Sequence, residues 1–141
     1  MFDIDFNDSG QVETLTGAGE ARLYLGSAGG LSASPAWTYQ GTQKGGRFGS
    51  SVAAIGDLNQ DGFGDVVIGA CQENTLDGRV YVFLGSAKGL GTTPLQVIAG
   101  PNDGWFGWDA AGVGDINKDG SPDLIVSAPY YTQPDPYINR R

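Results

Sequence analysis

Short apolar stretches separated by glycine, aspartate and proline run along most of this chain. They are rich in β-branched and aromatic side chains, which is typical of β-strands. No stretch of helical length has apolar residues at helical spacing. The pattern therefore predicts an all-β protein. The expected strands are Arg22–Leu25, Ala36–Gln40, Ser51–Ile55, Val66–Ile68, Arg79–Leu84 and Leu95–Ile98.

Two landmarks show that the chain repeats itself. Phe48-Gly49 returns 58 residues later as Phe106-Gly107, and Gly26-Ser27-Ala28 returns 59 residues later as Gly85-Ser86-Ala87. An aromatic or aliphatic run ending in Leu precedes both copies of Gly-Ser-Ala. A period above about 40 residues, with about four strands in each unit, indicates a β-propeller built from four-stranded antiparallel blades.

A nine-residue acidic loop follows the first strand of the repeat and occurs twice. It reads DLNQDGFGD in the first copy and DINKDGSPD in the second. Positions 1, 3, 5 and 9 carry side-chain oxygens, position 6 is glycine, and position 7 offers its backbone carbonyl. This spacing suits Ca²⁺, which takes six to eight oxygen ligands. The candidate metal ligands are Asp57, Asn59, Asp61, Phe63 and Asp65 in the first loop and Asp115, Asn117, Asp119, Ser121 and Asp123 in the second.

Other interpretations of the acidic loop are possible. An EF-hand needs glutamate at position 12 and flanking helices, whereas position 12 here is Ile68 or Val126, inside an apolar run of β type. Asp, Asn and Gly also favour turns that hold no metal. Three carboxylates in one short turn would repel one another without a cation, so we expect about two bound Ca²⁺ per chain. Mg²⁺ fits less well because it prefers a tight octahedron with several waters.

These landmarks together resemble the FG-GAP repeat, the blade of integrin alpha-subunit propellers and of many bacterial surface proteins. Phe48-Gly49 and Phe106-Gly107 match the first half of the signature. Gly69-Ala70-Cys71 and Ser127-Ala128-Pro129 each differ from Gly-Ala-Pro at one residue. The resemblance covers roughly residues 19–131. It implies a cation loop between the first two strands of each blade, protein binding in some members, and an extracellular or cell-surface location.

The boundaries of the repeat divide the chain into one complete blade flanked by two incomplete ones. We expect an irregular N-terminal segment (1–18), a half blade with strands three and four (19–47), a complete blade with a Ca²⁺ loop (48–105), and a half blade with strands one and two, the second Ca²⁺ loop and a C-terminal tail (106–141). Half blades leave strand edges unpaired. Either the chain is a fragment of a longer propeller, or copies associate into a closed ring. A trimer with six blades is the favoured ring.

Composition narrows the choice of function. The net charge is −8, six of the 16 acidic residues lie in the two loops, and no basic patch exists, so we expect no nucleic-acid partner. The absence of histidine excludes Ser-His-Asp and Cys-His catalytic systems and His-ligated zinc. The single cysteine, Cys71, is expected to be buried. No apolar stretch is long enough to span a membrane, and the first residues lack the basic start and apolar core expected of a signal peptide.

These observations predict a non-enzymatic, calcium-binding β-propeller that serves as a scaffold or as an adhesion-type interaction module, with a protein or glycan ligand. The calcium would be mainly structural. The alternative is a carbohydrate-binding, lectin-like propeller. Trp105 and Trp108 are the candidate stacking residues for sugars, because the matching positions of the previous repeat, Arg47 and Ser50, are not aromatic.

Overall fold

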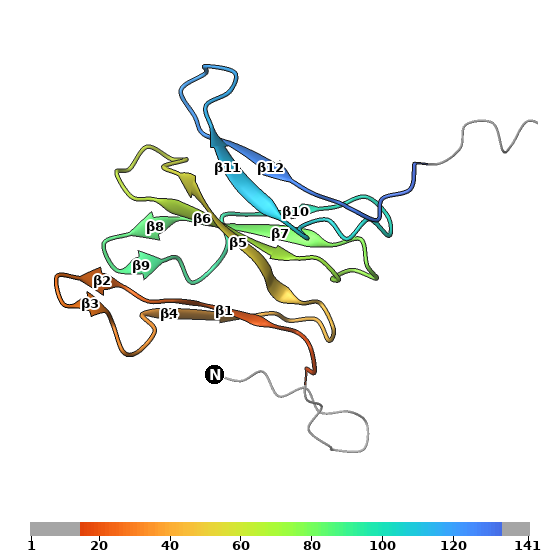
Figure 1. Ribbon diagram of the computed structural model, residues 1–141, viewed down its shortest axis with the longest axis horizontal. Helices are drawn as coiled ribbons and strands as arrows, with labels where there is room; N and C mark the ends of the chain where they lie inside the picture. Colours follow the sequence, from red (N-terminus) through yellow and green to blue (C-terminus); the bar gives the residue numbers. More distant parts are fainter. Residues whose placement is uncertain (1–14, 134–141) are drawn as a thin grey trace, which may run out of the picture.

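Three antiparallel sheets stack face to face in the order of the chain (Figure 1). The computed structural model describes residues 15–133, which form twelve strands and contain no helix that could cross a membrane. The first sheet pairs β1 (Glu20–Leu23) with β4 (Trp37–Gln40). The middle sheet has the order β10-β7-β6-β5, formed by β5 (Phe48–Gly56), β6 (Asp65–Ala70), β7 (Arg79–Phe83) and β10 (Gln96–Ala99). The third pairs β11 (Ala110–Gly114) with β12 (Asp123–Val126).

The all-β fold class is confirmed, and each of the six expected strands is present. Two small hairpins were not expected. They join β2 (Gly26–Ser27) to β3 (Gly30–Leu31) and β8 (Gly85–Ser86) to β9 (Gly89–Leu90), at the two copies of Gly-Ser-Ala. The boundaries assigned to the four segments stay predictions, and most of the segment 1–18 lies outside the described residues.

The core consists of two apolar clusters, one on each face of the middle sheet. Side chains alternate between the faces of a strand, so Ile68 and Phe83 face the first sheet while Val67 and Val82 face the third. The first cluster is rich in aromatic rings; Trp37 and Phe83, for example, pack edge to face with ring centroids 5.1 Å apart. Because both faces are covered, β6 and β7 are apolar along nearly their whole length.

The Phe-Gly pairs lie where one sheet meets the next. Phe48 donates its N–H to Ala18 O at 2.8 Å, and Phe106 donates to Asp77 O at 3.0 Å. Beside them, Gly19 and Gly78 form isolated bridges to the same two phenylalanines. Both glycines have positive φ, and a Cβ on either would lie 2.1 Å from the phenylalanine carbonyl oxygen. The contact between sheets therefore requires glycine there.

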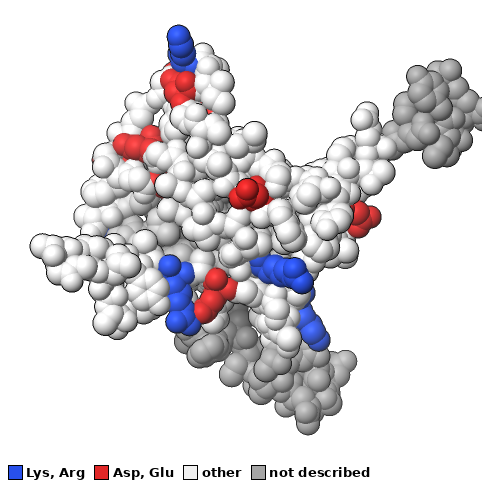
Figure 2. All heavy atoms as spheres, viewed as in Figure 1, with Lys and Arg blue, Asp and Glu red and all other residues white. Residues whose placement is uncertain are grey.

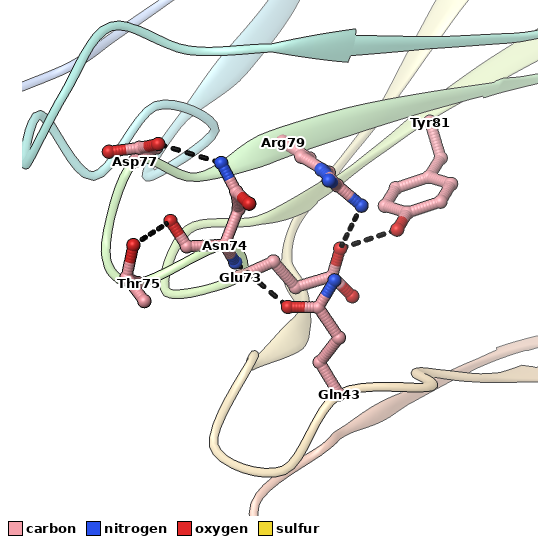
Figure 3. A network of polar contacts seen from close by, with 7 residues as sticks. All are labelled: Gln43, Glu73, Asn74, Thr75, Asp77, Arg79 and Tyr81. Carbon is pink, nitrogen blue, oxygen red and sulfur yellow. Dashed lines mark hydrogen bonds and ion pairs between the residues drawn. The ribbon is translucent and has the colours of Figure 1, made fainter.

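The loop between β6 and β7 contains a buried carboxylate, Glu73 (Figure 3). Its Oε2 accepts a hydrogen bond from the Tyr81 hydroxyl and lies 4.0 Å from Arg79 Nη1. Its Oε1 is buried and accepts no hydrogen bond from the described residues. Burial raises the pKa of Glu73, against the smaller opposing effects of Tyr81 and Arg79. Burial and the neighbouring Glu73 raise the pKa of Tyr81 to about 12, so this hydroxyl stays protonated. Cys71 is also buried, as expected.

Candidate functional site

The two acidic loops connect β5 to β6 and β11 to β12, and they project from the same end of their sheets (Figure 1). They are neighbours: Gln60 of the first loop donates from Nε2 to the carbonyl oxygen of Gly120 in the second at 3.0 Å. Acidic side chains are visible at both loops in the space-filling view (Figure 2). Each loop lies between the first two strands of its sheet, where the FG-GAP resemblance placed it.

The aspartate at position 1 holds each loop in a tight turn by accepting hydrogen bonds from backbone amides at positions 5 and 6. Asp57 accepts hydrogen bonds from the backbone N–H of Asp61 at 3.0 Å and of Gly62 at 2.7 Å. Asp115 accepts the same two bonds, from Asp119 at 3.0 Å and Gly120 at 2.8 Å. The sixth-position glycines have φ of 92° and 95°, a left-handed conformation that glycine adopts without strain.

Positions 3 and 5 bring further oxygens to each turn. Asn59 donates from Nδ2 to Asp61 Oδ2, and Asn117 donates to Asp119 Oδ2, both at 2.8 Å. The other oxygen of Asp119 accepts from Ser121 N at 2.9 Å. These bonds, chiefly the one from Ser121, lower the pKa of Asp119 and so favour its ionised form. Every hydrogen bond within the first loop has its counterpart in the second.

The ninth-position aspartates differ between the loops. Asp65 is fully buried and accepts from Leu58 N at 2.7 Å and from Gly85 N, at the start of the β8–β9 hairpin, at 2.8 Å. Asp123 is partly exposed and accepts only the equivalent first bond, from Ile116 N at 2.7 Å. Its Oδ1 accepts no hydrogen bond from residues 15–133. Asp65 therefore fastens its loop to a turn 20 residues away, a role that loop spacing alone could not reveal.

The side-chain oxygens at positions 1, 3 and 5 of each loop accept hydrogen bonds from the loop's own amides. Within residues 15–133, no three acidic, cysteine or histidine side chains converge into a cluster that could hold a metal ion. The donor set of each loop still fits a hard cation, because it consists only of carboxylate, amide and carbonyl oxygens. Each carboxylate oxygen has two acceptor sites, and backbone and side-chain amides use at most one of them.

A second candidate site is an aromatic cluster beside the third sheet. The ring of Trp105 lies 5.4 Å from that of Trp108 and 4.6 Å from that of Tyr130, centroid to centroid. Trp108 is 45% exposed and Tyr130 is 58% exposed. The Arg47 guanidinium carbon lies 6.0 Å from the centre of the Trp105 ring. The structure thus brings together the two tryptophans identified in the sequence and adds Tyr130 and Arg47, which come from distant segments.

Comparison with known proteins supports the relationship suggested by the landmarks. The FG-GAP-like repeat family matches residues 57–126, which include both acidic loops. Mouse integrin alpha-IIb is 36% identical over 143 aligned positions, which cover 88% of this chain and 14% of the relative. The chain belongs to the FG-GAP repeat family. Its sheets are FG-GAP propeller blades like those of integrin alpha subunits.

Other relatives have the same character. Mouse integrin alpha-8 is 36% identical over 147 positions, covering 88% of this FG-GAP chain and 14% of the relative. Human integrin alpha-6 is 32% identical over 136 positions, covering 89% of the chain and 12% of the relative. The chain thus spans about a seventh of the length of the integrin relatives, or less.

Proposed function

We propose that this chain is a non-enzymatic, adhesion-type interaction module whose two acidic loops each bind one Ca²⁺ that stabilises the blades. The repeated turn carries the proposal: both loops orient the same all-oxygen donor set with equivalent hydrogen bonds. Similarity to integrin alpha subunits supports the adhesion-type role and an extracellular or cell-surface location.

In the first loop the side chains of Asp57, Asn59 and Asp61 and the carbonyl of Phe63 would hold the ion, with Asp65 completing or bracing the site. The equivalent residues of the second loop are Asp115, Asn117, Asp119, Ser121 and Asp123. Binding requires Asn59 to turn its amide oxygen inward and to give up its bond to Asp61. Bound Ca²⁺ would neutralise the carboxylates and link the end of β5 to the start of β6.

Thermal unfolding with and without Ca²⁺ tests this proposal. A ligand that binds only the folded state stabilises it by about 2.7 kcal/mol when its concentration is about 100 times Kd. We expect excess chelator to lower the Tm and Ca²⁺ to restore it. Asp61→Asn should remove about half of this calcium-dependent gain, because the second loop is intact.

Asp103→Asn is the matched control, because it removes one exposed carboxylate outside the loops without changing side-chain size. We expect the calcium-dependent gain in Tm to be the same as in the parent chain. A Tm that is identical in chelator and in Ca²⁺ would contradict the proposal.

The exposed aromatic cluster favours a second candidate function, carbohydrate binding. Trp108 and Tyr130 are both exposed, and their ring centroids lie 6.4 Å apart in an edge-to-face arrangement; exposed aromatic rings can stack on sugars. A glycan array combined with quenching of tryptophan fluorescence tests this function. Binding that is lost in Trp108→Ala would support it, whereas the absence of any glycan signal would leave protein recognition as the role of this surface.

A further inference from the structure

Two strands have an open edge within residues 15–133: β12 pairs only with β11, and β1 pairs only with β4. Ser127, just after β12, forms its backbone hydrogen bonds toward the β11 side. Its N–H donates to Asp109 O at 2.9 Å, and its C=O accepts from Gly107 N at 3.0 Å. Backbone groups of an antiparallel strand alternate in direction. Leu124 and Val126 therefore present their N–H and C=O groups to the open edge.

The same reasoning applies to β1. The carbonyls of Gly19 and Leu23 accept hydrogen bonds from the β4 side, from Gly41 N at 2.9 Å and Ala36 N at 2.8 Å. The alternate residues, Arg22 and the following Tyr24, therefore present their N–H and C=O groups to the open edge of β1. Both edges are ready to accept another strand.

The middle sheet provides a template for joining these two edges. In the repeat, β12 is the counterpart of β6 and β1 is the counterpart of β7, and the β6–β7 register places Val66 opposite Phe83 and Ile68 opposite Tyr81. The same register would place Leu124 opposite Tyr24 and Val126 opposite Arg22. These are the residues whose backbone groups face the open edges. We propose that β12 of one copy of this chain pairs with β1 of a second copy, in the register of β6 and β7.

The side chains of the two edges are complementary. Val67 of β6 is 0% exposed and packs in the cluster that contains Val80, Val82, Ala110, Leu124 and Val126. Its counterpart, Ile125, is 60% exposed. The counterparts of those five cluster residues are Ala21, Leu23, Val52, Val66 and Ile68. All five line one groove of about 300 Å³ beside β1. Ile125 of one copy fills this groove in the next copy.

The second copy also completes the second acidic loop. Asp65 uses Oδ1 to accept from Gly85 N, whereas Oδ1 of Asp123 has no donor among the described residues. The counterpart of Gly85 is Gly26, at the start of β2. In the proposed register, Gly26 of the second copy supplies this N–H. Because the contact joins opposite ends of the chain, it is head-to-tail and can close into a ring. Three copies give six blades, within the range of about four to eight found in propellers.

Light scattering on the full chain tests the association. We expect a mass of about three times 14.7 kDa, both with Ca²⁺ and with chelator. Ile125→Glu should reduce it to that of one chain, because a carboxylate would enter the apolar groove. Leu95→Glu is the matched control: Leu95 is 55% exposed and lies outside the proposed contact, so the mass should not change. A parent chain with the mass of one copy, or an Ile125→Glu variant with the parent mass, would overturn the proposal.

A cysteine pair tests the register. Val67 lies opposite Val82 in the template, which places Ile125 opposite Leu23 of the next copy. On oxidation, the double variant Leu23→Cys/Ile125→Cys should form chains linked by disulfides on a denaturing gel, up to three copies. The mismatched pair Leu31→Cys/Ile125→Cys should stay unlinked. Equal linkage of both pairs, or none in the matched pair, would overturn the register, and closed species of two or four copies would overturn the six-blade ring.

Discussion

Asp65 and Asp123 occupy the same position in the two acidic loops, but in the described part of the chain only Asp65 accepts a hydrogen bond from outside its loop, from Gly85. Making the same substitution in both loops therefore measures the contribution of that bond to stability. Asp65→Asn keeps the shape of the side chain but replaces one acceptor oxygen with an NH₂ group. Asp65 accepts from both Leu58 N and Gly85 N, so in the variant one of these N–H groups must face another donor. Hydrogen bonds to charged groups contribute about 1.5–3 kcal/mol each. Losing one and weakening the other should cost about 3 kcal/mol.

Asp123→Asn makes the same chemical change in a different setting. Asp123 accepts one hydrogen bond, from Ile116 N, and the asparagine oxygen can retain it while the NH₂ group points toward the open edge. We expect a cost of about 1 kcal/mol, the difference between a charged and a neutral acceptor. The two substitutions should therefore differ by about 2 kcal/mol in the free energy of unfolding.

The assay is urea unfolding followed by tryptophan fluorescence, in excess chelator so that calcium does not contribute. Both variants are compared in the Ile125→Glu background, where association of copies does not contribute either. Equal costs for the two variants would refute the reasoning, because the difference depends only on the extra bond between Asp65 and Gly85. A larger cost for Asp123→Asn would refute it as well.

Three other substitutions test the contact between blades and the buried carboxylate. Gly78→Ala should lower the free energy of unfolding by at least about 3 kcal/mol, because its Cβ would lie 2.1 Å from Phe106 O, on top of the strain of its positive φ. Gly114→Ala, which also has positive φ but open space around it, should lower it by only about 1 kcal/mol. Equal costs measured by thermal unfolding would contradict this reasoning. Because the raised pKa of Glu73 makes the folded state retain its proton above about pH 4.5, stability should fall as pH rises from there. Glu73→Gln should flatten that slope, and an unchanged slope would count against a destabilising buried charge.

Much of the fold could be predicted because the repeat is local and regular. The strands, the acidic loops and the Phe-Gly landmarks all depend on short-range patterns of apolar, acidic and glycine residues. The β-bulges in β5 could not be predicted in this way. They lie within Phe48–Gly56, a strand longer than the expected Ser51–Ile55, and they depend on pairing with β6 rather than on the sequence of β5 alone.

The candidate sites were predictable to different degrees. Loop spacing identified the oxygen side chains, but the buried role of Asp65 depends on Gly85, which only the tertiary fold brings near. The aromatic cluster likewise depends on Tyr130 and Arg47 reaching Trp105 from separate segments. Glu73 gave no signal in the sequence, since a lone glutamate in a loop is normally exposed. Its burial follows from the way its loop packs under Gly46.

Equilibrium dialysis against Ca²⁺, followed by metal analysis of the retained protein, tests the central claim that both acidic loops are calcium sites. We expect two Ca²⁺ per chain, and one per chain when Asp61 or Asp119 is replaced by alanine. Retention of no calcium by the folded parent chain would contradict the claim.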